Sequence, residues 1–126
     1  IAKVYEMVAD EAKEASVFRS YMDKERADIR AVVTEKLKAQ AKAGVRSYVL
    51  SPLLPHMSEL PITHDSERKI SRKVIPKEKF CFPAMIIVWN KKVAICSLTD
   101  DMTTIIENES IAKTFKILFQ YIWDTN

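Results

Sequence analysis

Residues 84–98 read AMIIVWNKKVAICSL, and this stretch decides the fold class. Two runs rich in β-branched and other apolar residues, 84–89 and 92–98, flank the pair Asn90-Lys91. Because Asn tolerates a positive φ, this pair predicts the turn of a β-hairpin. Side chains of a strand alternate between two faces, and in this hairpin both faces are apolar. The sheet that contains it must therefore be covered on both sides, by helices or by another subunit.

The preceding residues predict a strand, a helix and a second strand. Residues 15–22 (ASVFRSYM) carry β-branched and aromatic side chains, so we expect a strand over about 16–22. Asp28 is a suitable N-cap for a helix that extends to about residue 43, and Gly44 ends that helix because it enters the left-handed conformation readily. Residues 45–50 (VRSYVL) follow as a strand. A βαβ unit of this kind predicts parallel strands.

The rest of the chain completes an α/β pattern. Residues 1–12 have the apolar spacing of an amphipathic helix, 69–75 and 103–107 are typical of strands, and a final helix begins at Ser110 or Asn108. Residues 51–65 contain three prolines and predict an irregular loop. We therefore expect a mixed sheet of about five or six strands flanked by helices.

Composition is typical of one folded domain. The chain has 126 residues, of which 48% are apolar and 29% charged, and domains most often contain about 100–150 residues. The longest mainly apolar stretch, residues 80–89, is about half the length of roughly 20 residues that a membrane-spanning helix needs. We expect a cytoplasmic protein without a membrane span.

The positive charge of the chain is concentrated in one short segment. The net charge is only +3, yet residues 67–79 hold six basic and two acidic side chains. This basic patch consists of Arg68, Lys69, Arg72, Lys73, Lys77 and Lys79. One interpretation is a solvated strand edge guarded by lysines, and the other is a surface that neutralises nucleic-acid phosphates.

Other polar side chains give no pattern of catalysis or metal binding. Cys81 and Cys96 lie in apolar sequence, so we expect both to be reduced core residues. His56 and His64 fall in the proline-rich loop without a metal-ligand spacing, and we expect no metal and no cofactor. A single glycine excludes a glycine-rich phosphate loop. Asp100-Asp101 is expected to cap or solvate a turn.

The amino-terminal helix carries an apolar stripe of Ile1, Val4, Tyr5 and Val8. An isolated amphipathic helix must bury such a stripe. The stripe either packs on its own domain or pairs with a second copy, and the pattern alone leaves both open. We expect it to form the interface of a homodimer.

One family resembles this order of motifs. The segments KAGVRSYVLSP, ERKISRKVIP, FPAMIIVWNKKVAICSL and TTIIENESIAKTFKILFQYIW are similar to the carboxyl-terminal domain of TrmB-like transcriptional regulators. The resemblance covers residues 15–123. It implies that 1–14 form a linker or dimerisation helix and that 15–126 form a regulatory domain. It also implies a homodimer, a small-molecule effector, and DNA binding through a winged helix-turn-helix outside this chain.

That family domain is similar in fold to one half of the phospholipase D superfamily, whose signature is H-x-K-x-x-x-x-D. With Asn90 at the Asp position, Met85 falls at the Lys and Pro83 at the His. None of the three is retained, so the resemblance implies a non-enzymatic domain. Two alternatives stay open: a phosphodiesterase of the phospholipase D type, and a direct nucleic-acid binder that uses residues 68–79.

Overall fold

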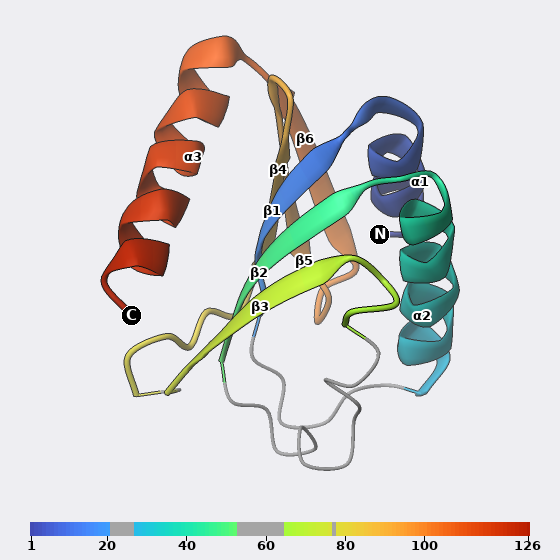
Figure 1. The fold of residues 1–126 in the computed structure, drawn as a ribbon, viewed down its shortest axis with the longest axis horizontal. Helices are drawn as coiled ribbons and strands as arrows, with labels where there is room; N and C mark the ends of the chain where they lie inside the picture. Colours follow the sequence, from blue (N-terminus) through green and yellow to red (C-terminus); the bar gives the residue numbers. More distant parts are fainter. Residues whose placement is uncertain (21–26, 53–64, 77) are drawn as a thin grey trace.

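Six strands form one mixed sheet with helices on both faces (Figure 1). The computed structural model describes residues 1–20, 27–52, 65–76 and 78–126. In chain order its elements are α1 (Ala2–Glu11), β1 (Glu14–Phe18), α2 (Ala27–Lys42), β2 (Arg46–Pro52), β3 (Ile70–Ile75), β4 (Met85–Trp89), β5 (Lys92–Ser97), β6 (Met102–Glu107) and α3 (Glu109–Asp124). The strand order is β3-β2-β1-β4-β5-β6. The expected α/β fold with a mixed sheet is thus confirmed.

The sheet has a parallel half and an antiparallel half. β1 pairs in parallel with β2, and β2 with β3, whereas β1–β4, β4–β5 and β5–β6 are antiparallel. The parallel pairing of β1 and β2 confirms the predicted βαβ unit. β1 begins earlier than predicted because Glu14 is already in register with Arg46. β1 also ends earlier than predicted, at Phe18, so Arg19 and Ser20 follow the strand. Residues 21 and 22, which were expected to end it, lie outside the described part of the chain.

The predicted hairpin is present, with Trp89 opposite Lys92 and Asn90 at a φ of 50°. Its side chains enter two separate hydrophobic clusters, which confirms that both faces are apolar and covered. One cluster, on the side of α1 and α2, contains Met85, Ile87 and Trp89. The other, under α3, contains Val88 and has Ile86 packed against it.

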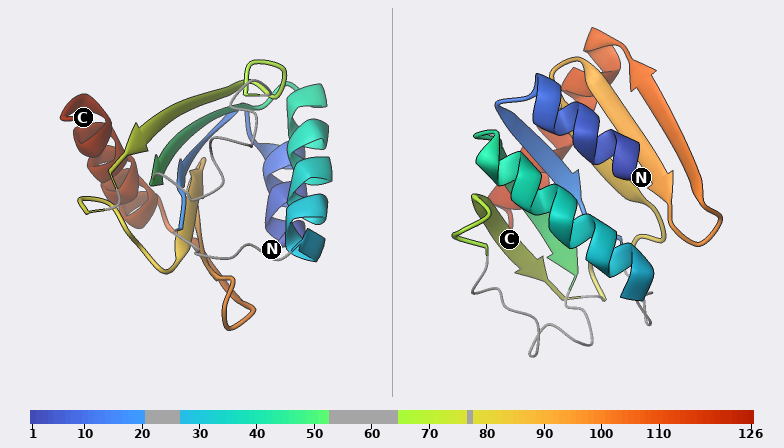
Figure 2. Two further views of the ribbon diagram at one scale, coloured as in Figure 1. Left: turned by 90° about the horizontal axis from the view of Figure 1, so that it is seen from below. Right: turned by 90° about the vertical axis from the view of Figure 1, so that its right-hand side faces the viewer.

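α1 and α2 lie side by side over one face of the sheet, and α3 covers the opposite face (Figure 2). Val4, Tyr5 and Val8 of α1 are buried, with relative exposures of 1%, 5% and 1% within the single chain. They belong to the same hydrophobic cluster as Val33 and Trp89. The apolar stripe of α1 therefore packs on its own domain, and it is not a free surface for a second copy. Residues 1–14 and the rest of the chain share this core.

Two hydrogen bonds hold α1 against α2. The Gln40 side-chain amide donates to the Tyr5 carbonyl oxygen at 3.1 Å, and Lys36 Nζ donates to the Glu6 carboxylate at 2.5 Å. Gln40 is 4% exposed, so its bond satisfies a buried polar group.

α3 begins at an Asn108 N-cap, whose side chain accepts a hydrogen bond from the Ile111 amide at 3.0 Å. This result decides between the two expected caps. Phe119 is buried, and Phe115 and Ile122 are partly buried against the sheet. Leu118, which shares their helical spacing, remains 46% exposed. In the described residues, no helix is long and apolar enough to cross a membrane.

Candidate functional site

A groove of about 500 Å³ lies between α3 and the sheet. It sits where β1 and β2 begin and where β4 ends. Its lining residues are Glu14, Ser16, Tyr48, Val88, Trp89, Asn90, Lys116, Phe119, Gln120 and Trp123. We call this space the α3 groove.

Three neighbouring strands supply the floor of the α3 groove. Ser16 of β1 is in register with Tyr48 of β2 on one side and with Val88 of β4 on the other. Residues that stand opposite one another in a sheet point to the same face, so these three side chains face α3 together. In the described part of the chain, the hydroxyl groups of Ser16 and Tyr48 have no hydrogen-bond partner. Both hydroxyls are therefore open to a ligand.

Aromatic residues of α3 form the wall. The Trp123 ring meets Tyr48 edge-on, with centroids 6.1 Å apart, and it stacks on Phe119 at 5.8 Å. Lys73 Nζ lies 5.1 Å from the centroid of the Trp123 ring and donates to the Trp123 carbonyl oxygen at 2.5 Å. These contacts fix Trp123 without a ligand, so the wall is preorganised.

Charged and amide groups form the rim. Lys116 Nζ donates to the Asn90 carbonyl oxygen at 2.6 Å, which ties α3 to the β4–β5 turn. The Glu14 carboxylate and the Gln120 amide complete the rim, and both residues are exposed. An aromatic wall with a few convergent polar groups on the floor and rim is typical of a small-molecule site.

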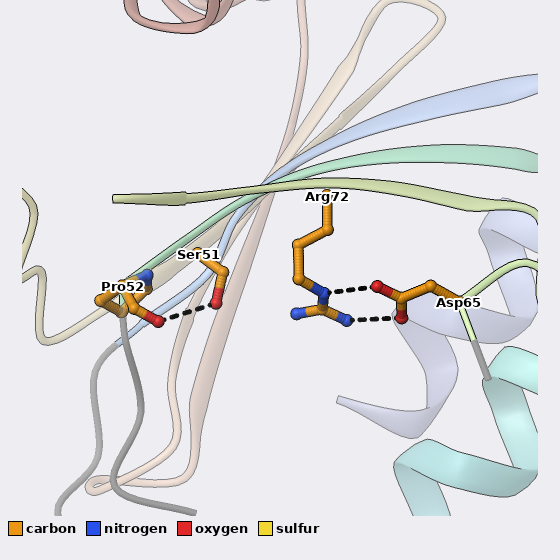
Figure 3. Close-up of polar contacts among 4 residues, drawn as sticks. All are labelled: Ser51, Pro52, Asp65 and Arg72. Carbon is orange, nitrogen blue, oxygen red and sulfur yellow. Dashed lines mark hydrogen bonds and ion pairs between the residues drawn. The ribbon is translucent and has the colours of Figure 1, made fainter. Parts of the chain in front are cut away.

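Two separate polar contacts lie beyond the groove, an ion pair at the start of β3 and a hydrogen bond at the end of β2 (Figure 3). Asp65 accepts two hydrogen bonds from Arg72, at 2.9 Å from Nε and 3.2 Å from a terminal nitrogen. The two side chains are only 12% and 18% exposed. The Ser51 hydroxyl donates to the Pro52 carbonyl oxygen at 3.0 Å. The two-bond geometry of the Asp65–Arg72 pair satisfies both buried charges.

The cavity beside this pair is too small for a ligand. Its volume is about 30 Å³, and Arg72, Gln40 and Ser47 are among its lining residues. A water molecule takes up about 30 Å³ of liquid. The Asp65–Arg72 pair thus holds the start of β3 in place, and the α3 groove is the better candidate site.

The three positions of the degenerate signature are spread along β4. Pro83 is exposed before the strand and Asn90 follows its end, whereas Met85 is buried at its start. The Tyr5 hydroxyl group donates to the Met85 sulfur at 3.8 Å. Asn90 donates through Nδ2 to the Glu11 carbonyl oxygen at 3.1 Å. In this chain Met85 and Asn90 therefore have packing and turn roles.

The basic patch does not form one free surface. Arg72 is bound to Asp65, and Lys73 donates to the carbonyl oxygens of Trp123 and Asn126. Lys69 and Lys79 are exposed and Arg68 is half-buried. Lys77 lies outside the described residues.

The predictions for the cysteines, the Asp100 turn and the histidines have different outcomes. Cys96 is buried as expected, but Cys81 is exposed because it lies between β3 and β4 outside the sheet. Asp100 accepts a hydrogen bond from the Ser97 hydroxyl group at 3.0 Å in the β5–β6 turn, as a turn-capping role predicts. His56 and His64 lie outside the described residues. Among the residues that are described, no group of three potential metal ligands is present.

Sequence reasoning did not identify the lining of the α3 groove. Glu14, Ser16 and Tyr48 stand on strands, and Lys116 and Gln120 on a helix far along the chain. Only the strand register and the packing of α3 bring them together. Ser16 and Tyr48 are not the only polar residues of β1 and β2, which also contain Glu14, Arg46, Ser47 and Ser51, so strand composition did not single them out.

Comparison with known proteins gives no family assignment. Neither the scan against protein-family models nor the search of curated proteins finds a match to this chain.

Proposed function

We propose that this chain is a non-catalytic regulatory domain of a prokaryotic TrmB-like transcriptional regulator, and that it binds a small-molecule effector in the α3 groove. The observation that carries the proposal is the pair of open hydroxyl groups of Ser16 and Tyr48 beside an aromatic wall. The groove volume of about 500 Å³ lies within the usual range for small-molecule pockets. Such a site fits a polar ligand with one flat apolar face.

The groove also offers a physical link between ligand and structure. Lys116 and Asn90 connect α3 to the hairpin, and Asn90 in turn binds the end of α1. A ligand that contacts this rim is in a position to change how α1 sits on the sheet. In the proposed regulator, α1 leads toward a DNA-binding module outside this chain. The protein would act in the cytoplasm.

The enzymatic alternative has less support. Pro83 supplies neither a nucleophile nor a general acid, and Met85 supplies no charge to hold a phosphate. Met85 is also 2% exposed, so its position is closed to substrate.

The nucleic-acid alternative has less support as well. Arg72 and Lys73, two of the six basic side chains in the patch, are committed to contacts within the domain. Counterion release scales with the number of phosphates neutralised, so the remaining charges favour weak binding without sequence preference.

A thermal-shift screen of small polar metabolites, followed by calorimetry, tests the effector proposal. We expect at least one compound to stabilise the chain, and the double variant Ser16→Ala/Tyr48→Phe to bind it about ten-fold or more weakly, because each neutral hydrogen bond contributes about 1 kcal/mol. Tyr48→Phe keeps the ring that packs on Trp123, so the fold is retained. Thr99→Ala, at an exposed turn, is the matched control. Hits that bind the double variant as tightly as the wild type would place the site elsewhere.

A further inference from the structure

We propose that the effector of the α3 groove is a free aromatic amino acid, bound as a zwitterion with its ammonium group on Glu14 and its carboxylate on Lys116. This ligand class rests on the proposed function, because it takes the α3 groove as the effector site. Glu14 and Lys116 then determine specificity. The ring of the ligand packs against the aromatic wall, which Phe119 and Trp123 form.

Glu14 and Lys116 are opposite charges on the rim of the groove, and both residues are exposed. Within the described residues, neither side chain forms an ion pair with another charged group. The Lys116 ammonium group donates to the Asn90 carbonyl oxygen at 2.6 Å and keeps further N–H donors. A ligand that carries both charges can therefore satisfy both side chains.

The sheet register brings the two charges to one end of the groove. Ser16 stands opposite Val88 in the antiparallel pair of β1 and β4, so the same register places Glu14 beside Asn90. Glu14 shares the face of Ser16, because side chains two residues apart in a strand point the same way. Lys116 reaches Asn90 from α3. The carboxylate and the ammonium group thus flank one residue, and a single small molecule can contact both.

Arg46 of β2 is a further charge on this face of the sheet. It stands opposite Glu14 in the parallel pair of β1 and β2, and it is exposed. No ion pair joins the two side chains in the part of the chain that the structure describes. Arg46 and Lys116 together outweigh the charge of Glu14, so a simple amine meets a net positive environment. A zwitterion also presents a carboxylate and fits these charges better.

The side of α3 that lines the groove changes from charged to aromatic along the helix. Lys116, Gln120 and Trp123 follow one another at helical spacing, so they lie along the same side. The Gln120 side-chain nitrogen donates to the Asp124 carboxylate at 2.8 Å, which leaves the Gln120 side-chain oxygen as an acceptor for an ammonium group. A ligand with its charges at one end and a flat apolar ring at the other matches this order.

Calorimetric titration of the 126-residue chain with three related compounds tests the ligand class. The probes are L-phenylalanine, its decarboxylated analogue phenethylamine and its deaminated analogue 3-phenylpropionate. We expect L-phenylalanine to bind, and each analogue to bind about five-fold or more weakly, because each lacks one of the two charges. Contacts to charged groups are strong when they are desolvated and weak at an exposed rim, so a factor of this size is expected.

Two rim variants assign the charges of the ligand. Glu14→Gln should weaken L-phenylalanine about five-fold and should not weaken 3-phenylpropionate, which has no ammonium group. Lys116→Gln should weaken L-phenylalanine by a similar factor and should not weaken phenethylamine, which has no carboxylate. Lys113→Gln is the matched control, because Lys113 is exposed on α3 outside the groove lining. A folding defect would weaken every ligand alike, and circular dichroism checks that each variant is folded.

Three results would overturn the zwitterion assignment. They are no binding of L-phenylalanine at millimolar concentration, an analogue that binds as tightly as L-phenylalanine, and a loss of affinity in Lys113→Gln as large as in the two rim variants. The effector site itself is judged by the Ser16→Ala/Tyr48→Phe variant. If that variant loses a neutral compound while L-phenylalanine does not bind, the effector site stands and the amino-acid ligand is excluded. If L-phenylalanine binds that variant and both rim variants as tightly as the wild type, it binds outside the groove, and the amino-acid assignment fails.

Discussion

The Glu11 carboxylate at the end of α1 accepts hydrogen bonds from Lys92 Nζ at 2.6 Å and from Trp89 Nε1 at 3.3 Å. The hydrogen bond from Lys92, with a smaller contribution from the Trp89 indole, lowers the pKa of Glu11 below its usual 4.5. The same contact raises the pKa of Lys92 above its usual 10.5. One carboxylate thus joins α1 to both strands of the β4–β5 hairpin.

This contact predicts a loss of stability in acid. Because the folded state lowers the pKa of Glu11, the contribution is fully present above about pH 4.5 and disappears as the pH falls through the lowered value. Glu11→Gln should therefore reduce the free energy of unfolding at pH 7 and have little effect near pH 2. Urea unfolding at a series of pH values measures the difference. Glu35→Gln, whose partner is one turn away on the same helix, is the control and should show a smaller effect. An equal loss at both pH values would exclude an ionic origin.

The α1 stripe predicts unfolding rather than simple dissociation when it is charged. Val8 is 1% exposed within one chain, so Val8→Glu buries a carboxylate without a partner. We expect it to lower the free energy of unfolding by about 3–5 kcal/mol, the usual penalty for an uncompensated buried charge. Lys3→Glu, on the exposed side of α1, should have little effect. If Val8→Glu instead gave a folded monomer with wild-type stability, the stripe would form a dimer interface and would not pack in the domain core.

Most helices, strands and turns of the fold could be predicted because short local sequence patterns determine them. The Asn90-Lys91 turn, the Asn108 cap and the Gly44 helix end each depend on backbone preferences that are visible in a few residues. The apolar faces of the hairpin then required layers on both sides, and the structure has them. Strand order and the antiparallel pairing of β1 with β4 depend on long-range contacts, and no local pattern specified them.

The candidate site could not be predicted from the sequence, because its residues also come together only through long-range contacts. Ser16 and Tyr48 become neighbours only through the parallel register of β1 and β2. Lys116 reaches Asn90 only because α3 folds back across the sheet. The sequence also did not decide where the α1 stripe packs, because Val4 and Val8 would fit a domain core and a dimer interface equally well. Burial against Val33 decided it.

The degenerate signature predicts that the chain does not hydrolyse phosphodiesters. A chromogenic phosphodiester should show no turnover above a buffer control, because no nucleophile stands at Pro83. Pro83→His changes an exposed position and should leave the fold intact. Asn90→Asp loses the hydrogen bond that the Asn90 amide donates to the Glu11 carbonyl oxygen, so we expect a modest loss of stability without unfolding. Met85→Lys buries an ammonium group at a residue that is 2% exposed, so we expect a loss of about 3–5 kcal/mol. Turnover by the wild type that is sensitive to these positions would contradict the non-catalytic proposal.

The β4–β5 turn predicts a ranking of substitutions at Asn90. Its φ of 50° lies in the left-handed region, which costs most side chains about 1–2 kcal/mol. Asn90→Ala should lower the free energy of unfolding by about this amount and also remove the hydrogen bond to Glu11. Asn90→Gly removes the same hydrogen bond but adopts this φ without strain, so it should be the less damaging change. Equal urea midpoints for the two variants would show that loss of the side-chain hydrogen bond dominates, and a lower midpoint for Asn90→Gly than for Asn90→Ala would contradict the predicted strain.

The two cysteines predict a clear difference in reactivity. Cys96 has no exposed surface in the sheet, and burial raises the pKa of its thiol above the usual 9.0. Cys81 is exposed and free. Because the thiolate is the reactive form, an aromatic disulfide reagent at pH 8 should modify one thiol rapidly, and the second only in denaturant.

Single variants assign the two phases to the two cysteines. Cys81→Ser should remove the rapid phase, and Cys96→Ser should leave it unchanged. In the Cys81→Ser variant, the slow reaction of Cys96 then requires an opening of the β4–β5–β6 part of the sheet, because β4 and β6 flank Cys96 at Met85 and Thr103. Its rate should rise with urea in parallel with unfolding. Rapid modification of two thiols in the native wild type would show that this part of the sheet opens without global unfolding, contrary to the burial of Cys96 in a shared core.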